Sequence, residues 1–188
     1  NRTNLEFYQE EVERRCGICL SDPTIYEAFT YYEREVLPYK NDDTINAKAM
    51  PGAHAALQAV QDAGLRCALF TNPSFPQGAI ECRMGWGELT DAPFELVTHM
   101  GNATRCKPDA TYYLEQLQVM GLDPHEVLMV GNDPKRDFPS PDCGIQTAYV
   151  GQGKPSRATW RGTMEDFAHN FNAVVEAFYE HQVADELS

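Results

Sequence analysis

From residue 50 onward, apolar runs of strand length alternate with stretches of helical periodicity, and this alternation restricts the possible folds more than any other feature. Helices are expected between the runs, for example over residues 77–86 and from Pro108 to Gly121. Strand–helix alternation is typical of βαβ units, in which helices cover both faces of a parallel sheet. The sequence therefore predicts an α/β core over residues 49–188. Its expected strands are residues 66–70, 94–98, 126–130 and, as the last one, 146–150.

The first 48 residues follow a different pattern. Residues 4–20 have helical periodicity, and Ser21-Asp22-Pro23 is a typical helix start, with a capping side chain and a proline in the first turn. Residues 38–46 form a polar break before the core. We therefore expect a small all-helical module over residues 1–48. Its second helix has an apolar stripe at helical spacing, formed by Ile25, Phe29, Tyr32 and Val36.

Charge and cysteine usage exclude several classes of protein. The 15 basic and 28 acidic residues give a net charge of −13, which argues against nucleic acid or an anionic membrane surface as partner. No apolar run reaches the roughly 20 residues of a membrane-spanning helix, so a soluble protein is expected. The 6 cysteines are spread along the chain. This spacing favours reduced thiols in the cytoplasm over a disulfide framework.

Polar residues follow three of the expected strands, in one case after a short loop. In open α/β sheets, ligands bind outside the carboxyl ends of the strands, so these residues are the candidates for chemistry. A hydroxyl can bind phosphate oxygens, a lysine offsets negative charge, and paired carboxylates can hold Mg²⁺. Taken singly, each also has an ordinary structural role, such as capping a turn. The candidates are Thr71, Asn72, Lys107, Asn132, Asp133 and Asp137.

Three segments resemble the haloacid dehalogenase (HAD) superfamily: ALFTNP at 68–73, the block from Lys107 to Asp137, and GIQTAYVG at 144–151. They are similar to its second, third and fourth motifs and to the strand that follows. The resemblance implies a Rossmann-like core, with residues 1–48 as the small helical cap found between motifs one and two in one subgroup. It also implies roles for the candidates. Thr71 would bind the transferring phosphoryl group, Asn72 would support its loop, Lys107 would neutralise charge, and the acids of motif four would bind Mg²⁺.

The chain departs from the family pattern at two places. Asn132 stands where the family has its first metal-binding acid, so either Asp133 takes the ion, or Asn132 lends an amide oxygen and Asp137 carries the charge. The first motif, an apolar strand ending in Asp-x-Asp, is absent. In the family this strand lies mid-sheet, and its loss would leave buried backbone groups unpaired. We therefore expect it to precede Asn1; a true loss would leave a scaffold.

The expected activity is Mg²⁺-dependent hydrolysis of a small phosphate monoester, such as a phosphorylated metabolite. The resemblance implies an aspartyl-phosphate intermediate, which divides one difficult step into two. A 2-haloacid dehalogenase is one alternative, although that chemistry needs no metal and the pair Asp133/Asp137 argues against it. A non-catalytic HAD-like interaction module is another, supported by the absent nucleophile. The sequence indicates neither the substrate nor the oligomeric state.

One further motif is the CxxC sequence at Cys16-Gly17-Ile18-Cys19. A redox pair would be expected at a strand-to-helix turn, and a zinc site would need a second CxxC. Because this motif lies at a helix end, the favoured interpretation is two packing residues around a helix-ending glycine.

Overall fold

The computed structural model describes residues 2–155 and 157–186, and the chain divides into two compact units. The first unit contains Asn1–Ala49 and Ala68–Cys106, and the second contains Met50–Cys67 and Lys107–Ser188. The expected boundary between a cap and a core at residues 48 and 49 stays a prediction. Within the described ranges, no helix is both long enough and apolar enough to cross a membrane.

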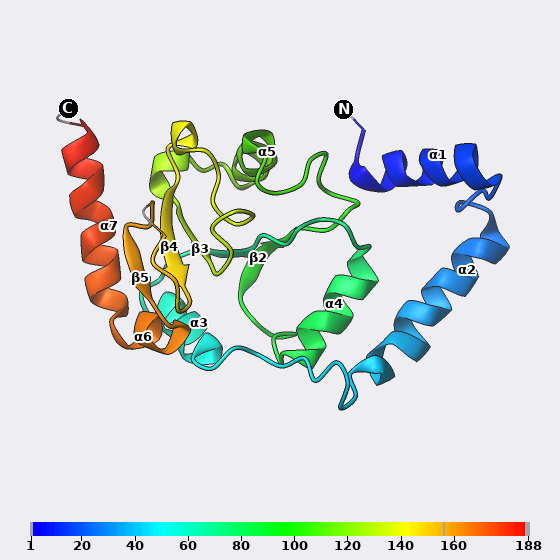
Figure 1. Ribbon diagram of the computed structural model, residues 1–188, viewed down its shortest axis with the longest axis horizontal. Helices are drawn as coiled ribbons and strands as arrows, with labels where there is room; N and C mark the ends of the chain where they lie inside the picture. Colours follow the sequence, from blue (N-terminus) through cyan, green and yellow to red (C-terminus); the bar gives the residue numbers. More distant parts are fainter. Residues whose placement is uncertain (1, 156, 187–188) are drawn as a thin grey trace. The chain divides into compact units, whose positions relative to one another are not determined.

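The second unit is built on a three-stranded parallel sheet with the order β3-β4-β5 (Figure 1). The strands are β3 (Leu128–Gly131), β4 (Gln146–Val150) and β5 (Trp160–Gly162). The expected bounds of β4 are confirmed. The expectation that it is the last strand is wrong, because β5 pairs with it in parallel. Strand β5 has only 3 residues, one of them an exposed arginine, and so gives almost no apolar signal.

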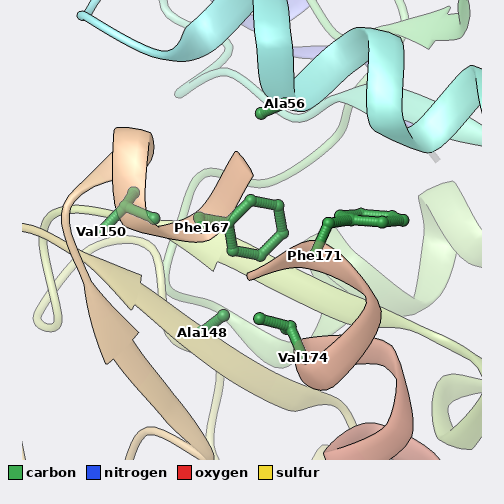
Figure 2. Close-up of a cluster of buried hydrophobic side chains, with 6 residues drawn as sticks. All are labelled: Ala56, Ala148, Val150, Phe167, Phe171 and Val174. Atoms are coloured by element: carbon green, nitrogen blue, oxygen red, sulfur yellow. The ribbon is translucent and has the colours of Figure 1, made fainter. Parts of the chain in front are cut away.

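Helices α3 (Ala53–Asp62), α6 (Met164–His169) and α7 (Phe171–Glu186) share one core with this sheet. Figure 2 shows the Phe167 ring between the side chains from the sheet and those from the helices. The ring makes edge-to-face contacts with Trp160 at 5.5 Å and with Phe171 at 5.8 Å. Such aromatic pairs add to the stabilisation from burial alone. The buried members are Ala56, Ala148, Val150, Phe167, Phe171 and Val174.

Strand β4 is buried on both of its faces. Ala148 and Val150 face the helical core, whereas Tyr149 belongs to a second cluster with Phe138 and Ala158. Because side chains alternate along a strand, burial of both sets is what a central parallel strand requires. This arrangement and the parallel register confirm the expected α/β fold.

Gly52 allows α3 to begin close to α6. Its φ of +86° lies in the left-handed region, and a Cβ at this position would meet the Glu165 backbone at 2.6 Å. A glycine is therefore required on both conformational and steric grounds.

The first unit contains a two-stranded sheet of β1 (Cys67–Leu69) and β2 (Phe94–Val97), together with α4 (Gln77–Trp86). Its helical segment is formed by α1 (Asn4–Cys16), α2 (Pro23–Tyr31), the π-helix η1 (Tyr32–Val36) and the 3-10 helix η2 (Leu37–Lys40). The indole of Trp86 donates to the Pro38 carbonyl at 3.2 Å, which ties α4 to η2. The start of α1 is bonded to the loop after β2 through the amides of Asn4 and Leu5.

The apolar stripe expected on the second helix is not a buried face. Phe29 is 52% exposed and Tyr32 is 45% exposed, and α2 has no buried residue. The helix also changes to π geometry at Tyr32, which alters the rotation per residue and ends the regular spacing. The aromatic side chains of this segment therefore face solvent in the described chain.

The first helix ends earlier than expected, at Cys16, because Gly17 takes a left-handed conformation with φ of +67°. The glycine therefore has the predicted helix-ending role. The packing role predicted for the two cysteines is wrong, since Cys16 and Cys19 are both exposed.

The remaining elements lie in the second unit. They are α5 (Ala110–Met120), the 3-10 helix η3 (Pro124–Glu126) and the 3-10 helix η4 (Pro141–Cys143). Asp109 caps α5 by accepting from the Thr111 amide at 2.9 Å, and Gly121 ends it in a left-handed conformation. The end at Gly121 is the predicted one, whereas the helix starts at Ala110, after the Asp109 cap, and not at the expected Pro108.

Candidate functional site

The loop after β3 folds as a tight turn around Asp133. The Asp133 Oδ1 accepts from the amides of Lys135 at 3.0 Å and Arg136 at 3.3 Å. The Asp137 amide donates to the Asp133 carbonyl at 2.7 Å, which completes the turn. Side chains of this type commonly satisfy backbone donors in turns. The turn returns the chain so that Asp137 lies against the end of β3.

Asp137 joins this loop to Lys107. Its Oδ1 lies 2.8 Å from the Lys107 Nζ, and its Oδ2 accepts from the amides of Asn132 at 3.1 Å and Asp133 at 2.9 Å. The Lys107 side chain is only 7% exposed and that of Asp137 is 15% exposed. A buried lysine without a counter-charge would be costly, and the Asp137 carboxylate supplies that counter-charge.

Gly131 makes the close approach of Asp137 possible. A Cβ at position 131 would lie 2.5 Å from the Asp137 Cβ, which is shorter than any normal contact. The last residue of β3 must therefore be a glycine for the carboxylate to reach the amides after it.

Tyr113 of α5 supports the same loop, and it is not among the candidates named from the sequence. Its ring is fully buried, and its hydroxyl donates to the carbonyls of Asp137 at 2.7 Å and Arg136 at 3.1 Å. Burial, and then the charge of Asp137, raise the pKa of this phenol, so the hydroxyl remains a donor. A buried tyrosine usually needs a partner for its hydroxyl, which is the signal that could have suggested this role.

Thr71 and Asn72 lie in the first unit, in the loop after β1. The Thr71 amide donates to the Thr98 Oγ1 at 2.8 Å, and its hydroxyl donates to the Thr98 carbonyl at 2.7 Å. The Asn72 carbonyl accepts from the Ser74 amide at 2.7 Å. The paired threonines fix the end of β1 against the end of β2. The convergence of Thr71 and Asn72 with Lys107 stays a prediction.

The structure therefore assembles four of the six candidates around one loop: Lys107, Asn132, Asp133 and Asp137. A pocket of about 570 Å³ in the first unit is a separate feature. It lies beside α4 and β2, and none of the six candidates lines it.

The oxygen atoms of this loop are of the kind that Mg²⁺ prefers, since Asp133 and Asp137 supply carboxylates and Asn132 an amide oxygen. Among residues 2–155 and 157–186, no three His, Cys, Asp or Glu side chains form a cluster that could hold a metal ion. Mg²⁺ commonly takes only one or two carboxylates and completes its shell with waters and substrate phosphate. The donor set thus fits a magnesium ion.

Residues 19–140 match the haloacid dehalogenase-like hydrolase family. The chain belongs to this family. Within it, the N-acetylmuramic acid 6-phosphate phosphatase of Pseudomonas aeruginosa is 28% identical over 116 residues. That alignment covers 61% of this chain and 50% of the Pseudomonas enzyme, so the chain spans about half the length of this relative.

Solved structures show the same HAD fold. The β-phosphoglucomutase of Clostridium difficile is similar with a TM-score of 0.61 at 14% identity, covering 93% of this chain and 78% of that chain. A HAD family hydrolase of Deinococcus radiodurans, solved with bound phosphate and sodium, has a TM-score of 0.56 at 17% identity and covers 90% of this chain and 74% of that chain. At these identities the similarity concerns the fold alone. The Rossmann-like fold expected from the sequence is confirmed.

Proposed function

We propose that this HAD-like hydrolase is a Mg²⁺-dependent phosphatase of a small phosphate monoester, with Lys107 and the loop after β3 as the core of its site. The observation that carries the proposal is the buried contact of 2.8 Å between the Lys107 Nζ and the Asp137 Oδ1. Two backbone amides converge on the other oxygen of the same carboxylate. A held ammonium beside oriented N–H groups is suited to stabilising negative charge.

Lys107 is the proposed charge-neutralising residue of the reaction. Asp137 fixes the position of its Nζ, so the ammonium is in place before the phosphate arrives. Preorganised charge of this kind costs no rearrangement at the moment of reaction. A phosphate oxygen bound at the Nζ would share the ammonium with Asp137, since a lysine has three donors.

Asp133 and Asn132 are the residues proposed to hold Mg²⁺, which when bound would act as a Lewis acid on a phosphate oxygen. Asp133 is 45% exposed, and its Oδ2 has only a long contact of 3.7 Å to the Arg136 Nε. Asp137 is far less exposed, and both of its oxygens already accept hydrogen bonds. This difference supports the proposal that Asp133 binds the ion and that Asp137 supports Lys107 and the loop.

Thr71 is the proposed binding residue for the transferring phosphoryl group, with Asn72 supporting its loop. The hydroxyl of Thr71 now donates to Thr98 and would turn to a phosphate oxygen. The proposed nucleophile is an aspartate outside these 188 residues, as the family's first motif implies. The helical segment at residues 1–48 is the proposed cap, which would exclude water from the site.

The substrate class that we propose is a phosphorylated sugar. The support is the Pseudomonas relative, a phosphatase of N-acetylmuramic acid 6-phosphate. The experiment measures phosphate release from that ester and from para-nitrophenyl phosphate, with Mg²⁺ and with EDTA, using the protein with its natural N-terminus. Mg²⁺-dependent release is expected with both esters. Halide release from a 2-haloacid without metal, or no turnover of any phosphate ester, would overturn the proposal.

Variants test the roles proposed for Lys107 and Asp133. Lys107→Ala is expected to lower kcat by about 10²-fold to 10³-fold, as loss of a transition-state donor does elsewhere. Asp133→Asn should raise the Mg²⁺ concentration needed for half-maximal activity more than Arg136→Ala, a change on the same loop that spares all oxygen ligands. Equal Mg²⁺ requirements in these two variants would remove Asp133 from the metal site.

A further inference from the structure

The two cysteines of the CxxC motif are placed at the joint between α1 and α2. Cys16 is the last residue of α1, and Asp22 caps the start of α2 (Figure 1). Gly17 ends the helix in a left-handed conformation with φ of +67°. Its amide donates a hydrogen bond to the Glu13 carbonyl at 2.9 Å. The Asp22 amide bonds the Cys19 carbonyl at 3.1 Å. Local hydrogen bonds therefore fix the joint on both sides of the cysteine pair.

Both thiols of this pair are accessible. Cys16 and Cys19 are exposed, and the Cys19 Sγ lies 3.2 Å from the Ser21 Oγ, a small hydroxyl that does not cover it. Only two residues separate them, and three peptide steps span roughly 10 Å at full extension. The chain itself therefore keeps the two thiols within a short distance of each other.

The other four cysteines are less suited to oxidation. Burial raises the pKa of Cys82 and of Cys143, which lowers the fraction of reactive thiolate. Cys67 is half-buried. Cys106 is exposed, but its thiol is in contact with the Asn4 side-chain amide, 3.8 Å away, and no neighbouring cysteine is adjacent in sequence.

We propose that Cys16 and Cys19 form a reversible dithiol–disulfide pair that exchanges with low-molecular-weight disulfides such as oxidised glutathione. One thiolate attacks the glutathione disulfide, and a mixed disulfide forms as one glutathione thiolate leaves. The second cysteine then attacks the mixed disulfide and releases the other glutathione. The pair loses two electrons and two protons, and one glutathione disulfide becomes two thiols.

A structural zinc site does not fit this pair as well. Zinc in structural sites takes four ligands, and the motif supplies two. Within the described part of the chain no third His, Cys, Asp or Glu joins them in a metal-binding cluster. The disulfide needs only the two sulfurs that are there.

The disulfide would close the joint between α1 and α2 covalently. The start of α1 is held by the loop after β2, and η2, beyond α2, is held by α4, so the joint lies between two anchored ends. A bond across it restricts the angle between the two helices. The pair is thus a redox-sensitive element in the segment proposed as the cap. Its oxidation does not require that the protein be a phosphatase.

The test equilibrates the protein in reduced and oxidised glutathione with EDTA present, alkylates the remaining thiols under denaturing conditions and counts them by mass. We expect the 6 thiols to fall to four as oxidant increases, with peptide mapping placing the bond between Cys16 and Cys19. Dithiothreitol should restore all of them. In Cys16→Ser and Cys19→Ser no second cysteine can resolve the mixed disulfide, so each variant should form no internal bond and should keep one bound glutathione at the remaining cysteine of the pair.

Cys106→Ser is the matched control, because it removes an exposed cysteine of the same unit and leaves the pair intact. It should still lose two thiols. Full retention of thiols at the highest oxidant ratio would overturn the proposal. So would a stable glutathione adduct on Cys16 or Cys19 of the wild-type protein, or a bond from this pair to any other cysteine or to a second chain.

Discussion

At the scale of single residues, Asp137 is the main stabilising side chain of the loop after β3. Its carboxylate accepts hydrogen bonds from a buried ammonium and from two backbone amides. Asp137→Asn removes the negative charge and leaves Lys107 buried without a counter-charge. We expect the free energy of unfolding to fall by about 3–5 kcal/mol, as when one partner of a buried ion pair is removed. Urea unfolding measures this loss.

The control for Asp137 is Arg136→Ala, which breaks an exposed ion pair on the same loop. Exposed pairs contribute little, so a change within about 0.5 kcal/mol is expected. Lys107→Met combined with Asp137→Asn should recover part of the stability, since no charge is then left buried. Equal losses in Asp137→Asn and Arg136→Ala would contradict the role assigned to Asp137.

Glu33 gives a prediction for the pH dependence of stability. Its side chain lies against Gly78, and burial, followed by the charge of Glu81, raises the pKa of this carboxyl above its usual 4.5. The folded state therefore holds the proton more tightly than the unfolded state does. Its contribution to stability is present below pH 4.5 and is lost as the pH rises through the raised pKa.

Glu33→Gln removes this titration with little change in size. We expect the variant to have a higher Tm than the wild-type protein at pH 7 and a difference near zero at pH 4. Thermal unfolding followed by circular dichroism across this range checks it. A variant that is less stable than the wild-type protein at pH 7 would show that the ionised Glu33 is stabilised by its surroundings.

At the scale of elements, α5 is the support of the candidate site, because the Tyr113 hydroxyl donates to two carbonyls of the loop after β3. Tyr113→Phe would leave both carbonyls without this donor. A loss of about 1–3 kcal/mol in unfolding free energy is expected, the usual cost of an unsatisfied buried polar group. Tyr39→Phe, at an 81% exposed position, should change it by less than about 0.5 kcal/mol. No difference between the two would refute this support.

The packing of α6 on the sheet depends on Phe167, which is 4% exposed and contacts two aromatic rings. Phe167→Ala should cost about 3–5 kcal/mol, because it removes the ring and leaves a cavity. Val119→Ala, on the 72% exposed position of α5, serves as the control and should be close to neutral. Urea unfolding of both variants measures the difference, and a near-neutral Phe167→Ala would contradict the assignment of this ring to the core.

Elements with clear start and stop signals could be predicted from the sequence. Helix α4 (Gln77–Trp86) and strand β4 (Gln146–Val150) have the expected bounds. The π-helix at Tyr32–Val36 could not be predicted, because the spacing of apolar residues gives no sign of a change in helix type. Strand β5 was missed because its stability comes from pairing with β4, a tertiary contact, and not from its own residues.

The candidate site was predictable in its residue types more than in its contacts. Lys107, Asp133 and Asp137 were predicted because each follows an expected strand in the sequence. The structure places all three in one unit. Asp137 can neutralise Lys107 only because the loop folds back and Gly131 leaves room for the carboxylate. The pattern of apolar and polar residues in the sequence does not reveal this contact. The role of Tyr113 could not be predicted either, because its spacing on α5 is that of an ordinary core residue.

At the scale of the whole molecule, the proposed reaction uses residues of both compact units. Lys107 and the acidic loop belong to one unit, whereas Thr71 and Asn72 belong to the other. The net charge of −13 is no obstacle to the proposed phosphate ester, because Lys107 and the proposed Mg²⁺ would set the local field. The central claim is that Thr71 and Lys107 act on the same phosphoryl group.

A double-mutant cycle on kcat/KM tests this claim most directly, using Thr71→Val, Lys107→Ala and the double variant in the protein with its natural N-terminus and Mg²⁺ present. Residues that act on one reacting group are strongly non-additive, so the double variant should lose little more than Lys107→Ala alone. If the two losses multiply, or if Thr71→Val leaves turnover unchanged, the two residues do not share a phosphate and the account is contradicted.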